Sequence, residues 1–340
     1  MGMNSFELIP TEENLIHTLD KDLLKRNKDL VRFYDLILVQ EGASSIAIDG
    51  RWGSGKTFFV KQSMLLINAK NPMSDMDDEK KASIVYALPF PKKAEDMPEN
   101  YDVAVYYDAW ENDNGTDPVL SLVYEIIKQL GINYAFDDNS NAFKLAGSVL
   151  EALTGRNING IIENLKSDNP LTKIKEEKDL HENIKNFFTE LLVERGNRLV
   201  VFIDELDRCK PSYAVQLLER IKHYLYDDRI TFVFSVNLGE LQHTIKHYYG
   251  NTFDACRYLD RFFDMRISLP PADKTAFYRE MGLESSYVLE KICRKVIDTY
   301  NMELREATRF YRQVKTAAYE PTHESRKFDF SFSDEKNECS

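Results

Sequence analysis

The segment Gly50-Arg-Trp-Gly-Ser-Gly-Lys-Thr57 has the residue types and spacing of a loop that cradles phosphate groups. Its glycines allow the backbone to curl until several N–H groups point inward at phosphate oxygens. Lys56 is expected to reach the outer phosphates, and the hydroxyl of Thr57 is expected to bind Mg²⁺. The candidate nucleotide-binding residues are therefore Gly50, Arg51, Trp52, Gly53, Ser54, Gly55, Lys56 and Thr57.

The context of this segment supports the same interpretation. A chance glycine-rich turn is the alternative, but an apolar stretch precedes the segment and a helical stretch follows it, as in a phosphate loop. The beginning of that helix adds its positive end to the site. For Trp52, packing against the fold is as good an explanation as contact with a ligand.

Acidic side chains close a second apolar stretch, Leu199–Ile203. A phosphate loop needs a carboxylate at the end of a neighbouring strand to hold the metal, and Asp204 is placed for that role. Glu205 comes next and is predicted to polarise the attacking water. For Asp207 and Arg208 two interpretations remain open: a part in this site, or a charged cluster that caps the following helix.

A third apolar stretch, Ile230–Val236, ends at Asn237. The amide of Asn237 is predicted to hydrogen-bond the attacking water or the γ-phosphate. An ordinary turn residue before a helix is the alternative.

These chemical groups require a scaffold in which strands alternate with helices. The sequence predicts strands at Ser45–Asp49, Ile84–Leu88, Val103–Tyr107, Leu199–Ile203, Ile230–Val236 and Met265–Leu269, and one long helix over Glu12–Val39. Asn71–Lys81 is expected to be a loop. The predicted fold class is α/β, a P-loop NTPase fold of three layers with a mostly parallel central sheet and a C-terminal helical lid.

Composition narrows the class of protein. The chain has 340 residues, 43% of them hydrophobic, and a net charge of -12. That acidic balance disfavours a surface that wraps nucleic acid. The four cysteines form no CxxC pair, and no secretory signal or membrane-spanning stretch is visible, so a cytoplasmic location is expected.

Together these segments resemble the KAP family of P-loop NTPases, in the ASCE division that also contains AAA+ and STAND proteins. The similar segments are GRWGSGKT, YYDAWENDNGTDPVLSLVYEI, IDELDRCKPSYAVQLLERIKHYL, SVNLGELQHTIKHYYG, RYLDRFFDMRISLPP and LREATRFYRQV. They occur in the family's order and cover roughly Leu15 to Lys315. Two features depart from the family: no membrane segments are inserted, and Asp204-Glu205 stands where two Asp are usual.

The resemblance implies roles that the residues alone do not. It places the Ile230 strand between the Ser45 and Leu199 strands. It also implies that Arg261 acts as an arginine finger or a structural base, and that Arg305 reaches the γ-phosphate from the lid. From the residues alone, exposed salt bridges explain both arginines equally well.

The expected organisation is a helical segment at 1–40, a P-loop NTPase core at 41–271 with a helical insertion around 136–195, a helical lid at 272–319 and a tail at 320–340.

The expected function is binding and hydrolysis of ATP with Mg²⁺, driving a conformational switch. Possible partners are a second copy of the chain and an unidentified protein. The family resemblance suggests phage defence or signalling. A nucleotide-dependent interaction module with negligible hydrolysis is the alternative, and a small-molecule kinase is a weaker one. The absence of an NKxD motif favours adenine over guanine weakly.

Overall fold

The computed structural model describes residues 9–90, 101–115, 117–130, 196–224, 227–283 and 287–318, with isolated residues between 186 and 195. Among these residues, a parallel sheet of five strands has the order β2-β3-β4-β1-β5. The strands are β1 (Ser44–Asp49), β2 (Asp102–Asp108), β3 (Arg198–Asp204), β4 (Ile230–Val236) and β5 (Met265–Ser268). The predicted α/β class is confirmed, and β4 lies between β1 and β3 as the family resemblance implied.

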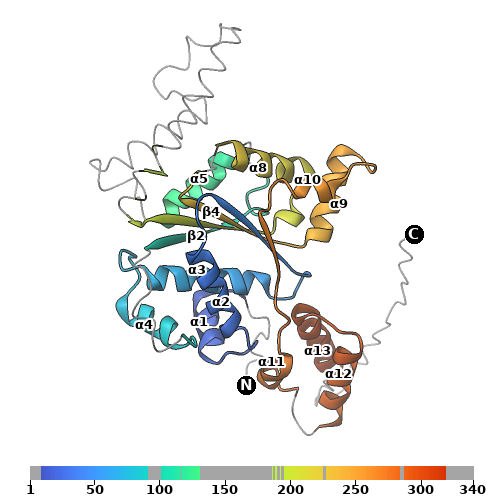
Figure 1. Cartoon of the computed structure of the whole chain (residues 1–340). Helices are drawn as coiled ribbons and strands as arrows, with labels where there is room; N and C mark the ends of the chain where they lie inside the picture. The colour runs from blue at the N-terminus through green and yellow to red at the C-terminus, as the bar shows by residue number, and fades with distance from the viewer. Residues whose placement is uncertain are drawn as a thin grey trace, which may run out of the picture.

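Helices cover both faces of the sheet because successive side chains of a strand point to opposite sides. On β3, Val201 and Ile203 pack against one layer and Phe202 packs against the other. The first layer contains α5 (Pro118–Gln129), α8 (Pro211–Tyr224), α9 (Leu238–Tyr249) and α10 (Ala255–Leu259). The second layer contains α1 (Glu12–Asp20), α2 (Asn27–Leu38), α3 (Lys56–Lys70) and α4 (Asp78–Tyr86), so the sheet lies between two helical layers (Figure 1).

A buried ion pair joins two strands at the amino end of the sheet. Arg198 donates from Nε to Oδ1 of Asp102 at 3.0 Å and from Nη2 to Oδ2 at 2.6 Å. The same Nη2 donates to the carbonyl oxygen of Ile37, near the end of α2, at 2.8 Å. Only 12% of the Arg198 side chain and 2% of the Asp102 side chain are exposed. The pair therefore fastens the edge strand β2 and helix α2 to β3.

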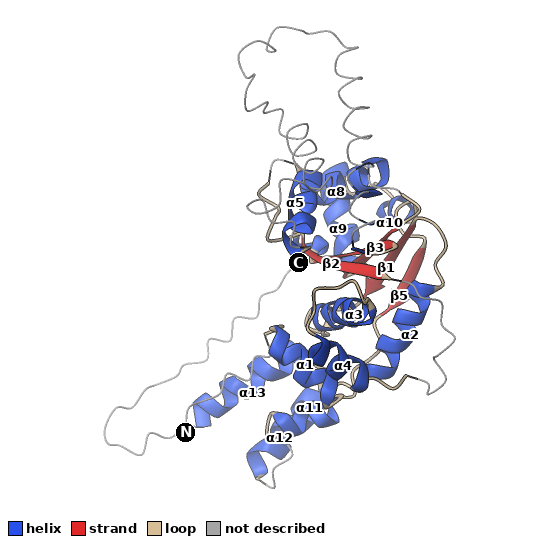
Figure 2. Cartoon of the chain, turned by 90° about the vertical axis from the view of Figure 1, so that its left-hand side faces the viewer, coloured by secondary structure: helices blue, strands red, loops and turns tan. Residues whose placement is uncertain are grey.

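Helices α11 (Lys274–Glu280), α12 (Val288–Thr299) and α13 (Leu304–Ala318) pack around an apolar cluster of their own. Figure 2 shows this group below the sheet, with α13 next to α1. The N–H of Asp273 donates to the carbonyl of Leu24 at 3.1 Å, and the N–H of Arg305 donates to the carbonyl of Gly53 at 3.4 Å. The beginning of α13 therefore lies against the phosphate loop.

Two predicted elements are wrong. Ile84–Leu88 is not a strand, because Ile84 lies in α4, which begins after Asp77 caps it by accepting from the N–H of Lys80 at 3.2 Å. The single helix over Glu12–Val39 is instead two helices, separated by a turn in which Asp22 and Lys25 have positive φ. The predicted loop at Asn71–Lys81 ends at Asp77 for the same reason.

Parts of the predicted organisation fall outside the described residues. These are most of the helical insertion around 136–195 and all of the tail at 320–340. The domain boundaries themselves stay predictions. Within the residues that the structure describes, no helix has both the length and the apolar character needed to cross a bilayer.

Candidate nucleotide-binding site

The phosphate loop joins the carboxyl end of β1 to the beginning of α3. Gly53 and Gly55 have φ values of +79° and +90°, a region that strains residues with a β-carbon. A β-carbon on Gly53 would also lie 3.0 Å from Cβ of Arg305. Glycine at this position therefore serves both the turn of the loop and the close approach of α13.

Lys56 begins α3 with its ammonium group folded back over the loop. Its Nζ donates to the carbonyl oxygens of Gly50 at 2.6 Å and Arg51 at 3.2 Å. The residue is only 9% exposed, and burial lowers its pKa, opposed by the nearby carboxylates. The hydroxyl of Ser54 is buried without a hydrogen-bond partner. A donor without an acceptor, beside a buried cation, fits an anion with several oxygen acceptors, such as a phosphate.

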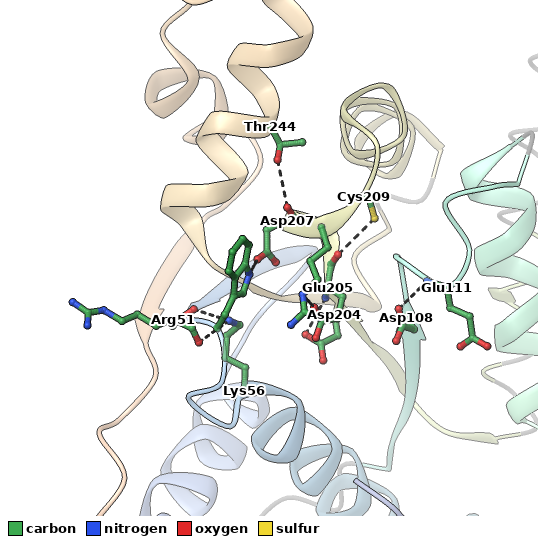
Figure 3. Close-up of polar contacts among 12 residues, drawn as sticks. Arg51, Lys56, Asp108, Glu111, Asp204, Glu205, Asp207, Cys209 and Thr244 are labelled. Atoms are coloured by element: carbon green, nitrogen blue, oxygen red, sulfur yellow. Dashed lines mark hydrogen bonds and ion pairs between the residues drawn. The ribbon is translucent and has the colours of Figure 1, made fainter. Parts of the chain in front are cut away.

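Two acidic residues follow each other where β3 ends. Asp204 is 1% exposed. Its Oδ2 accepts from the hydroxyl of Tyr106 at 3.1 Å, and its Oδ1 accepts from the N–H of Glu205 at 3.0 Å. Glu205 has φ +61° and forms an ion pair with Arg208. Figure 3 shows both acidic side chains across from Lys56.

The ionisation of Glu205 is perturbed by its surroundings. Burial, and after it the charge of Asp204, raises the pKa of Glu205 to about 7, although Arg208 opposes the shift. Burial also raises the pKa of Asp108 at the end of the neighbouring β2, and Asp204 adds to that effect. Carboxylates that lie this close together are stabilised in their charged form by a cation. Carboxylate oxygens are also the ligands that a magnesium ion prefers.

The turn after β3, η2 (Leu206–Arg208), is tied to the phosphate loop. Trp52 donates from Nε1 to Oδ2 of Asp207 at 2.6 Å, and Asp207 is 5% exposed. The carboxylate of Asp207 therefore binds the loop and does not cap α8. The guanidinium carbon of Arg208 lies 6.0 Å from the centre of the Trp52 ring and 5.5 Å from that of Trp110.

A cavity of about 310 Å³ brings these groups together. Small-molecule sites usually have volumes of about 300–1,000 Å³. The polar lining of the cavity comes from the phosphate loop, α3, the ends of β2 and β3, and the beginning of α13. Its residues are Arg51, Gly53, Gly55, Lys56, Thr57, Lys61, Tyr106, Asp108, Trp110, Glu205, Arg208 and Arg305.

The same cavity also has apolar lining residues. They come from the residues before α1, the turn between α1 and α2, α3 and the C-terminal helices, and include Pro10, Leu23, Leu24, Phe58, Phe277 and Leu304. The cavity thus offers both anion-binding groups and apolar surface, the two kinds of contact that a nucleotide needs.

Asn237 and Arg261 do not line the nucleotide-sized cavity. The Oδ1 of Asn237 accepts from the N–H of Glu240 at 3.3 Å and so caps α9, which is the alternative role considered from the sequence. Arg261 lies with Ser44 and Asp264 beside a small cavity where β1 begins. Because the phosphate loop follows the other end of β1, Arg261 is remote from the loop of its own chain. Arg305, in contrast, lines the nucleotide-sized cavity.

Several residues at the site were not assigned to it from the sequence. Tyr106, Asp108 and Trp110 come from the end of β2, and a signal for them existed, since the carboxyl ends of adjacent parallel strands share one edge. No pattern in the sequence pointed to Arg26 as part of the site. It is 5% exposed and donates from Nη1 to the carbonyl of Ser54 at 2.9 Å. Burial lowers its pKa to about 10.

The parallel sheet with the order β2-β3-β4-β1-β5 and the glycine-rich loop after β1 define a P-loop NTPase domain with a nucleotide-binding loop. The model of the KAP family P-loop domain matches residues 27–320, which is most of the chain. The chain belongs to this family. It is also similar to an uncharacterized protein of Methanocaldococcus jannaschii, with 33% identity over 95 residues. That match covers 25% of this chain and 49% of the relative, so it spans about half of the relative's length.

Proposed function

We propose that this chain binds ATP with Mg²⁺ and hydrolyses it. The observation that carries the proposal is the cavity of about 310 Å³, in which Lys56 and Thr57 of the phosphate loop, Glu205 after β3 and Arg305 of α13 all take part. No single stretch of sequence contains these four groups. Their convergence is what hydrolysis of a terminal phosphate requires: phosphate donors, a water-orienting carboxylate and an added cation.

The residues present fit Mg²⁺. Thr57 and Asp204 would hold the ion, which when bound neutralises charge on the β- and γ-phosphates. Lys56 would leave the loop carbonyls for phosphate oxygens, and Glu205 would orient water toward the γ-phosphate. The hydroxyl of Ser54 would find an acceptor. The apolar lining residues of the cavity would hold the base.

Hydrolysis would drive a conformational switch through α13. Arg305 lines the cavity from the first turn of that helix, and its N–H bonds the carbonyl of Gly53. Loss of the γ-phosphate would remove a partner of Arg305 and change how α13 packs against the phosphate loop. Family membership is the basis for proposing that this switch serves phage defence or signalling.

Phosphate release from Mg-ATP tests the proposal. Lys56→Ala should abolish nucleotide binding measured by calorimetry, whereas the exposed Lys28→Ala should leave it unchanged. Glu205→Gln should retain binding and lower turnover by roughly 10²-fold or more. Asp204→Asn should weaken the dependence of binding on Mg²⁺. Unchanged ATP affinity in folded Lys56→Ala would refute the assignment of the phosphate loop.

An interaction module that binds nucleotide with negligible turnover is the second candidate. It is favoured by one observation, the ion pair that holds Glu205 to Arg208. The same phosphate-release assay separates the two, since the module would bind ATP and release no phosphate.

The two arginines suggested by the family can be separated by mixing variants. Because Arg261 is remote from its own loop, it would act on a neighbouring copy. Activity per chain should then rise with protein concentration, and mixing Arg261→Ala with Lys56→Ala should restore turnover in part. If Arg305 acts within its own chain, specific activity stays constant and mixtures remain inactive. Wild-type rates in both Arg261→Ala and Arg305→Ala would show that neither arginine takes part.

A further inference from the structure

Arg208 has three partners at once, one carboxylate and two indole rings. Its guanidinium forms an ion pair with Glu205 and lies within about 6 Å of the rings of Trp52 and Trp110, at 6.0 and 5.5 Å. Both Arg208 and Glu205 line the nucleotide-sized cavity, and 23% of the Arg208 side chain is exposed. The guanidinium is therefore partly exposed at the cavity in which a ligand would bind.

The charges around Arg208 make it a competitor for any phosphate. Asp108, Asp204 and Asp207 all act on Glu205 through their charges, so this side of the cavity is strongly acidic. Arg208 forms an ion pair with Glu205 in that cluster. A terminal phosphate would approach the same side, since Glu205 must reach water beside it.

We propose that Arg208 exchanges partners during the cycle: it pairs with Glu205 when the terminal phosphate is absent and binds that phosphate when ATP is present. The exchange leaves Glu205 free to orient water only while a γ-phosphate is bound. This inference rests on the proposed function.

The exchange has a physical basis in charge and geometry. A terminal phosphate carries more negative charge than a carboxylate and accepts the same bidentate pair of N–H bonds from a guanidinium. The indole faces of Trp52 and Trp110 attract the cation whichever anion it binds. Trp52 is itself part of the phosphate loop, and its hydrogen bond to Asp207 holds its ring beside Arg208.

A comparison of two ligands tests the exchange. A non-hydrolysable ATP analogue carries the terminal phosphate, whereas ADP lacks it. Arg208→Gln should weaken binding of the analogue about tenfold or more and binding of ADP less than about threefold, the scale of one lost charge-assisted contact. The matched control is Arg32→Gln, because Arg32 pairs with Asp29 on the surface of α2. It should change neither affinity.

A double-mutant cycle separates exchange from a merely structural role. Glu205→Gln removes the competing carboxylate, so the analogue should bind about threefold or more tightly than to the wild type. In the Arg208→Gln background the same change should have no effect, because the competition no longer exists. A purely structural Arg208 predicts the same effect of Glu205→Gln in both backgrounds.

The tryptophans give an optical measurement that is independent of turnover. The chain has two tryptophans, and both lie beside Arg208. The analogue should change their fluorescence more than ADP does, and Arg208→Gln should abolish that difference. Equal loss of analogue and ADP affinity in Arg208→Gln would overturn the exchange while leaving the proposed function intact. A wild-type chain that binds neither nucleotide would overturn both.

Discussion

A β-carbon added to Gly53 would test whether α13 rests on the phosphate loop. In Gly53→Ala the new Cβ would lie 3.0 Å from Cβ of Arg305, closer than the 3.5–4.0 Å or so of ordinary carbon contact. The positive φ adds backbone strain of about 1–2 kcal/mol. Overpacking of this kind costs about 1–3 kcal/mol more if nothing moves. Movement of α13 away from the loop would relieve the second cost.

Gly282→Ala is the matched control. Gly282 has φ +77°, close to the +79° of Gly53, but the nearest atom to its added Cβ is Oη of Tyr311 at an ordinary 3.8 Å. This variant should therefore show the backbone strain alone. The difference between the stability losses of the two variants isolates the contact between Gly53 and α13.

The assay combines urea denaturation with calorimetry of ATP binding. Gly282→Ala should lose about 1–2 kcal/mol of stability and keep its ATP affinity within about twofold. Gly53→Ala should bind ATP about tenfold or more weakly, a change of about 1.4 kcal/mol, because Arg305 is displaced with α13. Adding Arg305→Gly, which removes the opposing Cβ, should make the stability losses non-additive. Wild-type ATP affinity in Gly53→Ala would refute the reasoning.

Three further predictions concern buried charges. Arg198→Met should cost about 3–5 kcal/mol in urea denaturation, because it leaves Asp102 buried and unpaired. Arg26→Met should cost about 1–3 kcal/mol, because the buried carbonyl of Ser54 loses its donor. In the nucleotide-free chain, burial raises the pKa of Glu205 from 4.5 to about 7. The folded chain then binds more protons than the unfolded chain between those values, so the free energy of unfolding should fall as pH rises through that window. Glu205→Gln should reduce that fall by an amount on the order of 2–3 kcal/mol.

Three outcomes would contradict these predictions. Wild-type stability in Arg198→Met would show that the ion pair contributes nothing to the fold. An unchanged urea midpoint in Arg26→Met would show that the loop carbonyl finds another donor. The same slope of stability against pH in Glu205→Gln and wild type would show that Glu205 does not titrate in this window.

Most of the sheet was predictable from the sequence because β2, β3 and β4 are apolar runs with polar residues at their ends. β3 and β4 were easily recognised as strands, because side chains buried on both faces of a sheet give a continuous apolar run in the sequence. The run Ile84–Leu88 has the same apolar character, but it is short, and such runs cannot be told from buried helix by periodicity. The cap at Asp77 decided the outcome in favour of helix. The break between α1 and α2 was not predictable, because it contains neither glycine nor proline.

The site was predictable where one segment contained its chemistry and unpredictable where distant segments meet. The phosphate loop and Asp204-Glu205 follow from local motifs. The ion pair of Arg208 with Glu205 depends on the positive φ of Glu205, which turns the chain back on itself. The family implied that Arg305 reaches the γ-phosphate, and the contact of its N–H with the carbonyl of Gly53 was found only in the structure. Tertiary packing alone brings Arg26 beneath the loop.

The position of Arg26 affects how fragments of this protein should be designed. The match to the family's P-loop domain begins at residue 27, one residue after Arg26. The guanidinium of Arg26 bonds the carbonyls of both Ser54 and Pro270, each at 2.9 Å, and helix α1 packs on α3. An expression fragment trimmed to the family match would contain every recognised motif and still lack the side chain that supports the phosphate loop from below. Weak nucleotide binding by a fragment of that kind would result from its truncation and would not describe the longer chain.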